Sequence, residues 1–564
     1  MNYRTSSKAY ILPFLFIMAL YVPLHAQIEP NILEEKVDSL LSESISDVTP
    51  GSAVLVIKDK EIVLNKGYGL ANLDYDIPIM PSTVFDLASV SKQFAGYAIA
   101  SLAEQGVLSE EDDVRKYIPE LPEFDQTITI AHLLHHTSGI RDWTSTLPLS
   151  GRSFEDVISM DHILRMAFQQ EDLNFTPGSE YRYSNTGYNL LAEIVQRTTG
   201  LTFREWTDQH IFQPLGMTQT LFLDDHNEVI KNRAIGYYQR DDEYRYAPNT
   251  LTALGSSSMY STTTDMAKWA NHIMYPADEK KAVVERMMTT RPLSNGNDNN
   301  YAYGISRNTF RGTPWISHSG GWASFRTYIT LLPEQDLAIV VLSNNSRNPF
   351  SIAGQIAGFY VPEETTDQQV ANSDDGADPI ENLALSDELL DAYVGTYKLG
   401  TGWYVHLTKE NGQLWTQATN EDKYPMFALS DSLFQIPDYG DRTMQFYSDE
   451  SGAITHLVYN DITSPKMSAE TEASLTNGTE YEGEYISSEL NTSYTVMYDQ
   501  GELKLWNFHH GDIPLQQAWN DDFSGSMWYT NSVEFKRDEQ GNIVGLSVSQ
   551  YRARNQFFRK KTVN

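Results

Sequence analysis

Apolar residues recur at helical spacing near the start of the chain and then give way to strand-like runs. From residue 32 the intervals of three and four predict an amphipathic helix on these positions: Leu33, Val37, Leu40, Leu41 and Ile45. Two β-rich runs follow at residues 53–58 and 61–68, with Asp59 and Lys60 between them. This arrangement predicts a β-hairpin.

The pattern then becomes helical before strands return. Small residues mark a helix predicted from 89 to 105, and residues 110–300 look mainly helical, interrupted by Pro and Gly loops. Strand patterns reappear at residues 325–332 and 337–344, before a last apolar helix at 351–360. Strands at both ends of a segment with a large helical insert predict one sheet, assembled from the two ends and covered by helices.

An internal repeat fills the C-terminal part of the chain. Three landmark pairs lie 88 or 89 residues apart: Val394-Gly395-Thr396-Tyr397 with Glu482-Gly483-Glu484-Tyr485, Asn411-Gly412 with Gln500-Gly501, and Phe446 with Phe535. Short alternating strands with Asn-Gly or Gln-Gly turns predict that each unit is a small antiparallel barrel. Chance similarity between two β-rich stretches is the alternative, and the near-constant offset argues against it.

A chain of 564 residues is too long for one ordinary domain. Residues 362–385 are acidic and poor in large apolar residues, which is typical of a linker. The predicted division is a signal peptide at 1–26, a catalytic domain at 27–361, this linker, and barrel-like repeats at 386–466 and 467–564. A loop of the repeats that caps the catalytic pocket would influence which substrates enter it.

The first residues have the pattern of an export signal. Arg4 and Lys8 give a basic start, an apolar stretch covers residues 10–22, and Leu24-His25-Ala26 has the form of a signal-peptidase site. We expect cleavage after Ala26, a periplasmic or secreted location, and no stable membrane anchor after cleavage. An uncleaved anchor is the alternative, although the apolar stretch is short for a transmembrane helix.

Charge and cysteine content exclude several classes of function. The formal net charge of -34 argues against nucleic acid or an anionic membrane as a partner. The absence of cysteine excludes disulfides, zinc thiolate sites, a cysteine nucleophile and a lipoprotein anchor. The sequence leaves room for a homo-oligomer without indicating its size.

The clearest chemical motif is Ser89-Val90-Ser91-Lys92. A spacing of three on a helix places the Ser89 and Lys92 side chains on one face, about 5–6 Å apart at Cβ. A serine hydroxyl needs a base to take its proton, and a lysine whose pKa is lowered by burial or nearby cations can be that base. The motif alone is weak, because this pair also occurs on ordinary helix surfaces.

Two further segments offer groups that complete such a site. In Tyr183-Ser184-Asn185 the phenol could relay protons to a leaving group, and the amide of Asn185 could hold a substrate carbonyl or the lysine. His318-Ser319-Gly320-Gly321 precedes a predicted strand, where glycine lets a substrate approach the strand edge. The Gly321 N–H could be a second oxyanion donor.

In this order the three motifs resemble those of the penicillin-recognising serine hydrolases. Within them the chain is most similar, over about residues 30–361, to the class C β-lactamase branch, which includes D-alanyl-D-alanine carboxypeptidases, D-aminopeptidases and esterases. The resemblance implies an α+β fold of the β-lactamase/transpeptidase type, with an antiparallel sheet, flanking helices and a helical subdomain. Three supporting segments match as well: 133–139, 212–217 and 255–262.

The resemblance also implies a role for each motif residue. These roles are the acylated nucleophile for Ser89, its base for Lys92, an acid/base partner for Tyr183, a substrate contact for Asn185, the strand wall for His318 and Gly320, and oxyanion donors for the Ser89 and Gly321 amides. One departure concerns the third motif, where class C β-lactamases have Lys-Thr-Gly and this chain has His318-Ser319-Gly320. A histidine is mostly neutral at pH 7, so it does not supply the permanent cation that binds a β-lactam carboxylate. The His-x-Gly form is more similar to the D-peptidase and D-aminopeptidase members, and this resemblance implies a short D-residue-containing peptide as the substrate.

Several alternatives stay open at this point. Carboxylesterase or β-lactamase activity is the alternative within the family, and a non-catalytic penicillin-binding sensor is the alternative of another class. His132, His135 and His136 have spacings that a metal could use, but a structural role near a helix C-terminus is favoured, and no metal or organic cofactor is expected.

Tryptophans offer a further open choice. Trp143, Trp315 and Trp322 could line a pocket or pack in the core. Core or rim packing is favoured for any one of them, although Trp322 directly follows the third motif.

Overall fold

The computed structural model describes most of the chain, in these segments: 28–361, 383, 385–400, 403–418, 423–436, 442–449, 451–459, 462–467 and 478–562. The predicted signal peptide lies outside the described residues, as do residues 362–382 and 384 of the predicted linker.

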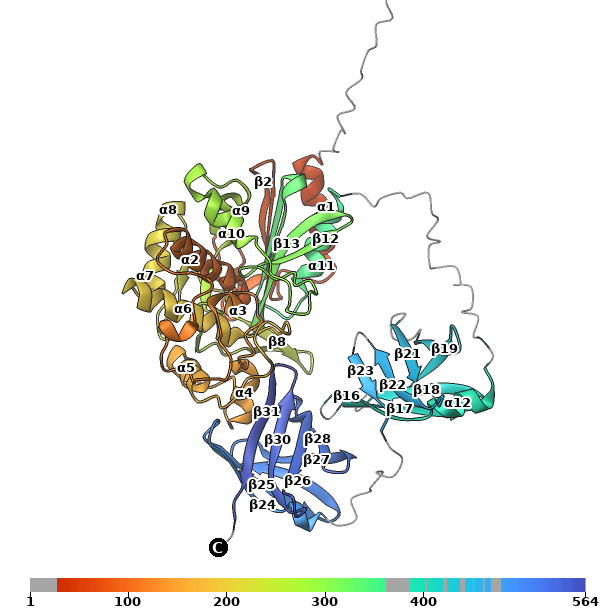
Figure 1. Ribbon diagram of the computed structural model, residues 1–564. Coiled ribbons are helices and arrows are strands. Elements are labelled where there is room, and N and C mark those ends of the chain that lie inside the picture. The colour runs from red at the N-terminus through yellow and green to blue at the C-terminus, as the bar shows by residue number, and fades with distance from the viewer. Residues whose placement is uncertain are drawn as a thin grey trace, which may run out of the picture.

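A six-stranded antiparallel sheet forms the centre of the catalytic unit (Figure 1). Its strands, in spatial order, are β12 (Ser306–Phe310), β13 (Thr313–Trp322), β14 (Phe325–Leu332), β15 (Leu337–Ser343), β1 (Ser52–Lys58) and β2 (Glu61–Tyr68). The first hairpin is confirmed, with Asp59 and Lys60 at positive φ in its turn. Pairing of β1 with β15 confirms that the two ends of the segment build one sheet.

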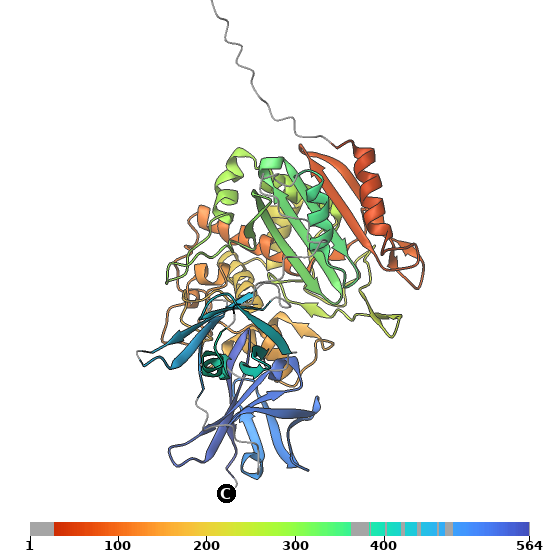
Figure 2. The ribbon, with the colours of Figure 1, turned by 90° about the vertical axis from the view of Figure 1, so that its right-hand side faces the viewer.

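The internal strand β1 is buried on both faces and packs against both helical layers. Ala53, Leu55 and Ile57 belong to the core shared with the helical insert. Val54 and Val56 point to the other face and pack with helices α1 (Pro30–Ser42) and α11 (Pro349–Gly358). Figure 2 shows the strands of this sheet side by side, from the side of the molecule on which the terminal helices lie.

The insert carries the remaining elements of the catalytic unit. Its helices of seven residues or more are α2 (Lys92–Glu104), α4 (Trp143–Leu149), α5 (Met160–Phe168), α6 (Asn185–Thr199), α9 (Thr263–Met274) and α10 (Lys281–Met287), with α3 (Ile130–Leu134) and α7 (Phe203–Thr207) between them. A small antiparallel sheet, which the sequence analysis did not predict, joins β5 (Phe85–Asp86), β11 (Met259–Ser261) and β7 (Leu221–Phe222). This sheet lies directly before the Ser89 turn.

The C-terminal repeat consists of two eight-stranded units. The first contains β16 (Gly395–Gly400), β17 (Trp403–Glu410), β18 (Gln413–Ala418), β19 (Lys423–Ala428), β20 (Leu433–Ile436), β21 (Arg442–Ser448), β22 (Ile454–Tyr459) and β23 (Ile462–Pro465). The second is a closed barrel of β24 (Gly483–Ser487), β25 (Thr492–Asp499), β26 (Glu502–Asn507), β27 (Gly511–Trp519), β28 (Asp522–Gly525), β29 (Ser532–Arg537), β30 (Ile543–Gln550) and β31 (Ala553–Lys560).

Equivalent tyrosines make equivalent contacts in the two units. The Tyr397 hydroxyl donates to the Tyr393 carbonyl (2.8 Å), and the Tyr485 hydroxyl donates to the Tyr481 carbonyl (2.6 Å). An isolated bridge between Tyr397 and Lys466 brings the first unit close to closure. The α+β fold with two barrel-like C-terminal units is therefore confirmed. None of the helices in the described segments is long and apolar enough to cross a membrane.

Candidate active site

Ser89 lies in a tight turn that leads into α2. The helix predicted from 89 to 105 is a 3-10 turn (Ala88–Ser91) followed by α2. Ala88 has a φ of 47°, a left-handed conformation that costs a non-glycine residue of order 1–3 kcal/mol. Its N–H donates to the buried Asp86 carboxyl (2.7 Å), whose pKa burial raises to about 6. This hydrogen bond stabilises the strained turn that presents Ser89 to the pocket.

Lys92 is fully buried, and its amine lies within hydrogen-bond distance of three oxygens. Its Nζ is 3.1 Å from Ser89 Oγ, 2.8 Å from Asn185 Oδ1 and 2.7 Å from the Ser256 carbonyl oxygen. Burial lowers its pKa well below the usual value, and the positive charge of Arg552 lowers it further against the opposing effect of Asp142. A neutral amine has two N–H groups, which Asn185 and Ser256 can accept, and its lone pair is then left for the Ser89 proton.

Tyr183 lies between the Lys92 amine and the Arg552 guanidinium, beside the nucleophile. Lys92 Nζ is 4.9 Å from the ring centroid, and the guanidinium carbon of Arg552 is 4.9 Å from it. Burial raises the pKa of Tyr183, while a hydrogen bond with Ser89 opposes the rise, so the phenol is protonated at neutral pH. His136 packs against the ring at 4.2 Å between centroids and accepts the Ser184 N–H, which fixes the segment before α6.

The Asp142 carboxylate fixes the orientation of Asn185 through hydrogen bonds. It accepts the Asn185 backbone N–H and side-chain Nδ2, each at 3.1 Å, and the Thr144 hydroxyl at 2.7 Å. The side chain of Asp142 is fully buried. These bonds direct the Asn185 oxygen toward Lys92, which is the orientation that holds the amine.

His318 is held as a neutral imidazole. Its Nδ1 lies 2.6 Å from the Ser319 carbonyl, which can only accept, so Nδ1 carries the proton. Nε2 then accepts the Tyr301 hydroxyl at 2.8 Å. Burial and the Lys92 charge lower the pKa of His318 to about 3. The third motif therefore supplies no cation near neutral pH.

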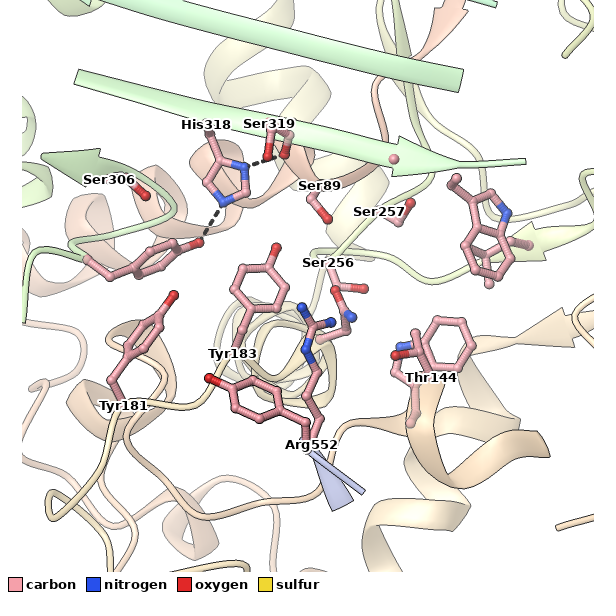
Figure 3. A pocket seen from close by; sticks show the side chains of 17 residues that line it. Ser89, Thr144, Tyr181, Tyr183, Ser256, Ser257, Ser306, His318, Ser319 and Arg552 are labelled. Carbon is pink, nitrogen blue, oxygen red and sulfur yellow. Dashed lines mark hydrogen bonds between the residues drawn. The ribbon is translucent and has the colours of Figure 1, made fainter. Parts of the chain in front are cut away.

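Strand β13 brings the third motif against the Ser89 turn. A Cβ added at Gly320 would lie 2.2 Å from Thr327 Oγ1 and 2.3 Å from the Leu87 carbonyl, so only glycine fits. Gly321 lines a cavity of about 610 Å³ together with Ser89, Tyr183, Asn185 and His318. Figure 3 shows Ser89 and His318 beside this strand, with Tyr183 and Arg552 facing them. The structure thus brings all seven motif residues together.

Two pairs of aromatic side chains line the cavity. Trp143 and Trp322 line the cavity as one pair, 5.8 Å apart between ring centroids, and Tyr181 and Tyr301 line it as another pair, 6.0 Å apart. Trp315 instead packs in the core behind the sheet and donates to the Tyr328 hydroxyl. Trp143 is 2% exposed within a second hydrophobic cluster, and Trp322 packs against that cluster at the cavity wall. The expectation of core or rim packing therefore holds for all three tryptophans, two of which also line the cavity.

The three clustered histidines have separate local partners. His132 accepts the Thr129 N–H in the capping box of α3, His135 Nδ1 contacts the Tyr301 carbonyl, and His136 supports the Tyr183 segment. Within the described residues no group of three His, Cys, Asp or Glu side chains could hold a metal ion.

Four contributors to the site were missed by sequence reasoning. They are Asp142, the Ser256 carbonyl, Tyr301 and Arg552. Ser256 lies in residues 255–262, which carried the resemblance. Its contact with Lys92 is made by the backbone carbonyl, and every residue type has one, so the sequence carries no signal for it. Arg552 comes from the turn between β30 and β31, and nothing in its local sequence indicates that the turn reaches this pocket.

Comparison with known proteins identifies the family. The Beta-lactamase family matches residues 32–357, more than half of the chain. The chain belongs to the beta-lactamase family. Protein flp of Staphylococcus aureus (strain MRSA252) is 31% identical over 322 residues, which cover 56% of this chain and 63% of that protein. The beta-lactamase-family chain thus spans slightly less than two thirds of the length of this relative.

Other similar proteins extend beyond the catalytic unit. A penicillin-binding protein of Bacillus subtilis (strain 168) is 26% identical over 433 residues, covering 72% of this chain and 92% of that protein. An octameric penicillin-binding protein homologue from Pyrococcus abyssi has a TM-score of 0.52 at 20% identity, covering 86% of this chain and 100% of that chain. SurE has a TM-score of 0.54 at 21% identity, covering 78% and 99%. These structures share the fold of this beta-lactamase-family chain.

Burial of His318 in its neutral form makes the free energy of unfolding depend on pH. Its pKa is lower in the folded chain than the ordinary 6.5, so the stabilising contribution is complete above pH 6.5 and is lost as pH falls toward 3. The loss of unfolding free energy caused by His318→Asn is therefore expected to shrink by about 2 kcal/mol between pH 7.5 and pH 5. Urea unfolding of wild type and His318→Asn at pH 7.5 and pH 5 measures this change in unfolding free energy.

The exposed His509→Gln substitution is the control, with the same difference expected at both pH values. A His318→Asn loss that is equally large at pH 5 and pH 7.5 would contradict a neutral buried imidazole.

Proposed function

We propose that this chain is an exported serine hydrolase that cleaves short peptides containing D-residues through an acyl-enzyme on Ser89. The observation that carries the proposal is the buried Lys92 amine, 3.1 Å from the Ser89 hydroxyl, with its other contacts made to two acceptors. Family membership supports hydrolytic chemistry, and the predicted signal peptide supports a periplasmic or secreted location.

The proposed first step is attack of Ser89 on a carbonyl. Neutral Lys92 takes the Ser89 proton as the oxygen bonds to the carbonyl carbon, and the backbone N–H groups of Ser89 and Gly321 stabilise the oxyanion. Protonated Tyr183 gives its proton to the leaving group and recovers one from Lys92. Water then repeats the sequence on the acyl-enzyme, with Asn185 contacting the substrate.

The two aromatic pairs of the cavity suggest where each half of the substrate binds. The proton donor Tyr183 lies 6.3 Å from His318 and 6.1 Å from Tyr301 between ring centroids. The leaving group therefore binds on the Tyr183 side of Ser89. The acyl group extends toward Trp143 and Trp322, which favour an apolar side chain.

Two observations support a peptide over an antibiotic. The third motif holds a neutral histidine where a permanent cation would bind the carboxylate of a β-lactam. SurE, one of the proteins that share the fold, was solved with D-Leu. Another, EstCE1, is described as a hydrolase with promiscuous acyltransferase activity, so an ester is the alternative substrate to test.

Covalent labelling tests the nucleophile, and a substrate panel tests the specificity. A fluorophosphonate or a slowly hydrolysed β-lactam is expected to add its mass to the peptide that contains Ser89. Turnover of D-Ala-containing peptides and D-Ala anilide is expected to exceed that of the L-Ala compounds, p-nitrophenyl acetate and a chromogenic cephalosporin. The heat-denatured protein is the control for both measurements.

Three results would overturn parts of the proposal. Labelling at another residue contradicts Ser89 as the nucleophile. Preference for the cephalosporin or the acetate ester assigns a β-lactamase or a carboxylesterase instead. Labelling without turnover of any substrate assigns a non-catalytic penicillin-binding sensor.

A further inference from the structure

The hairpin turn between β30 and β31 forms part of the catalytic pocket. Tyr551 and Arg552 occupy this turn, and both line the cavity that contains Ser89. In Figure 1 the tip of this hairpin, drawn in blue, meets the catalytic unit close to α4. A barrel that follows the catalytic unit in the chain thus supplies one wall of the pocket.

Hydrogen bonds from the catalytic unit hold the turn in place. The Arg552 carbonyl accepts the Asp142 N–H at 3.1 Å and the Asn174 side-chain amide at 3.0 Å. The Arg554 N–H donates to Asn174 Oδ1 at 2.7 Å. A buried ion pair between Arg141 and Glu489, 2.9 Å apart, joins the same two units. With its backbone fixed on both sides, the Arg552 side chain is preorganised rather than free to move with a loop.

Arg552 has unused hydrogen-bond donors that face the cavity. One guanidinium nitrogen of Arg552 lies 3.3 Å from Asp142 Oδ2, and the Arg552 side chain is 38% exposed. Asp142 is the one hydrogen-bond acceptor that the guanidinium contacts within the described residues, so most of its five N–H donors remain available. Figure 3 shows the guanidinium directed into the pocket beside Tyr183.

The charges of the lining residues determine whether the cavity favours an anionic or a cationic ligand group. Arg552 is the one permanently charged side chain among those that line the cavity in the described part of the chain. Among the described residues no Asp or Glu lines the cavity, because Asp142 is covered by Asn185, Thr144 and Arg552. A substrate ammonium group therefore finds no anion, whereas a carboxylate finds a planar cation suited to bidentate binding.

We propose that Arg552 binds the free carboxylate of the substrate's leaving residue, and that the peptide is therefore cleaved at its C-terminal end. The guanidinium lies 4.9 Å from the ring of Tyr183, the proton donor, which places the carboxylate on the leaving-group side of the scissile bond. This rests on the proposed D-peptide hydrolysis and chooses a D,D-carboxypeptidase over a D-aminopeptidase. The second barrel thus supplies a cation on the Tyr183 side of the pocket, a different position from that of the third motif on β13.

Paired substrates that differ only in the carboxylate test the role of Arg552. An N-acylated D-Ala-D-Ala peptide is compared with its C-terminal amide, and an N-acyl-D-Ala ester of D-lactate is compared with the corresponding methyl lactate ester. Wild type is expected to prefer the free acid in each pair by about 10- to 100-fold in kcat/KM. In Arg552→Gln this ratio is expected to fall to about 1, and Arg552→Lys is expected to keep part of it.

The Arg554→Gln variant is the matched control. Arg554 lies on the same hairpin but contacts Glu180, so its replacement is expected to leave the ratio unchanged. An unchanged ratio in Arg552→Gln, or a wild-type ratio near 1, overturns the inference. If the peptides are not cleaved but the ester ratio depends on Arg552, the D-peptide proposal fails and the carboxylate site stands.

Discussion

Replacement of Ser89 by alanine is expected to lower kcat for the best substrate of the panel by about 10⁴- to 10⁶-fold. The substitution removes the oxygen that we propose forms the acyl-enzyme, and within the described residues it is the one hydroxyl in hydrogen-bond contact with the Lys92 amine. Steady-state kinetics of purified Ser89→Ala and wild type measure the loss, and the covalent label should be absent from the variant.

The Ser89→Ala variant must be folded for its loss of kcat to report on the chemistry. The Ser89 side chain faces the pocket. The thermal unfolding midpoint of the Ser89→Ala variant is therefore expected to stay within a few degrees of wild type. Ser101→Ala, on the same helix α2, is the matched control and should keep its activity. Substantial turnover by Ser89→Ala would rule out the acyl-enzyme at this residue.

Replacement of Lys92 by arginine is expected to lower kcat/KM by about 10²- to 10⁴-fold. Arginine keeps the positive charge but stays protonated, so it cannot take the Ser89 proton. Burial lowers the pKa of Lys92, and the acid limb of the wild-type pH profile should therefore lie well below pH 10.5. Because the base acts only when neutral, activity rises with pH through this limb.

The pH profile distinguishes a base from a structural lysine. In Lys92→Arg and Lys92→Gln the acid limb is expected to disappear, whereas a purely structural role would lower activity and leave the limb in place. Lys116→Gln, at an exposed position, is the control for a general effect of lost charge. A wild-type profile whose acid limb persists in both Lys92 variants would contradict the assignment.

Local patterns were sufficient to predict the sheet and the main catalytic pair. Nearly continuous apolar runs in residues 53–58 and 337–344 mark strands buried on both faces, and these become the neighbours β1 and β15. Ser89 and Lys92 are three residues apart, so their proximity is a local property of the backbone. Tyr183, Asn185 and His318 were found by motif order, which substitutes for the missing knowledge of long-range contacts.

Other features depend on packing that a local pattern does not encode. The 3-10 turn at Ala88 is stabilised by Asp86 on the small sheet, which has strands of only two or three residues. Trp143 and Trp322 are separated by a long stretch of chain and are apolar whether they face a core or a pocket. Arg552 reaches Asp142 only because two folded units dock, and its hairpin looks like any other barrel turn in the sequence.

The docked hairpin has a consequence for how specificity can diverge. The groups that make and break bonds lie on the central sheet and its inserted helices, whereas the charge of the pocket comes from a turn residue in another folding unit. Exposed turn positions tolerate substitution better than core positions do. Substitutions in this turn can therefore change the charge of the pocket while Ser89, Lys92 and Tyr183 stay on their own elements.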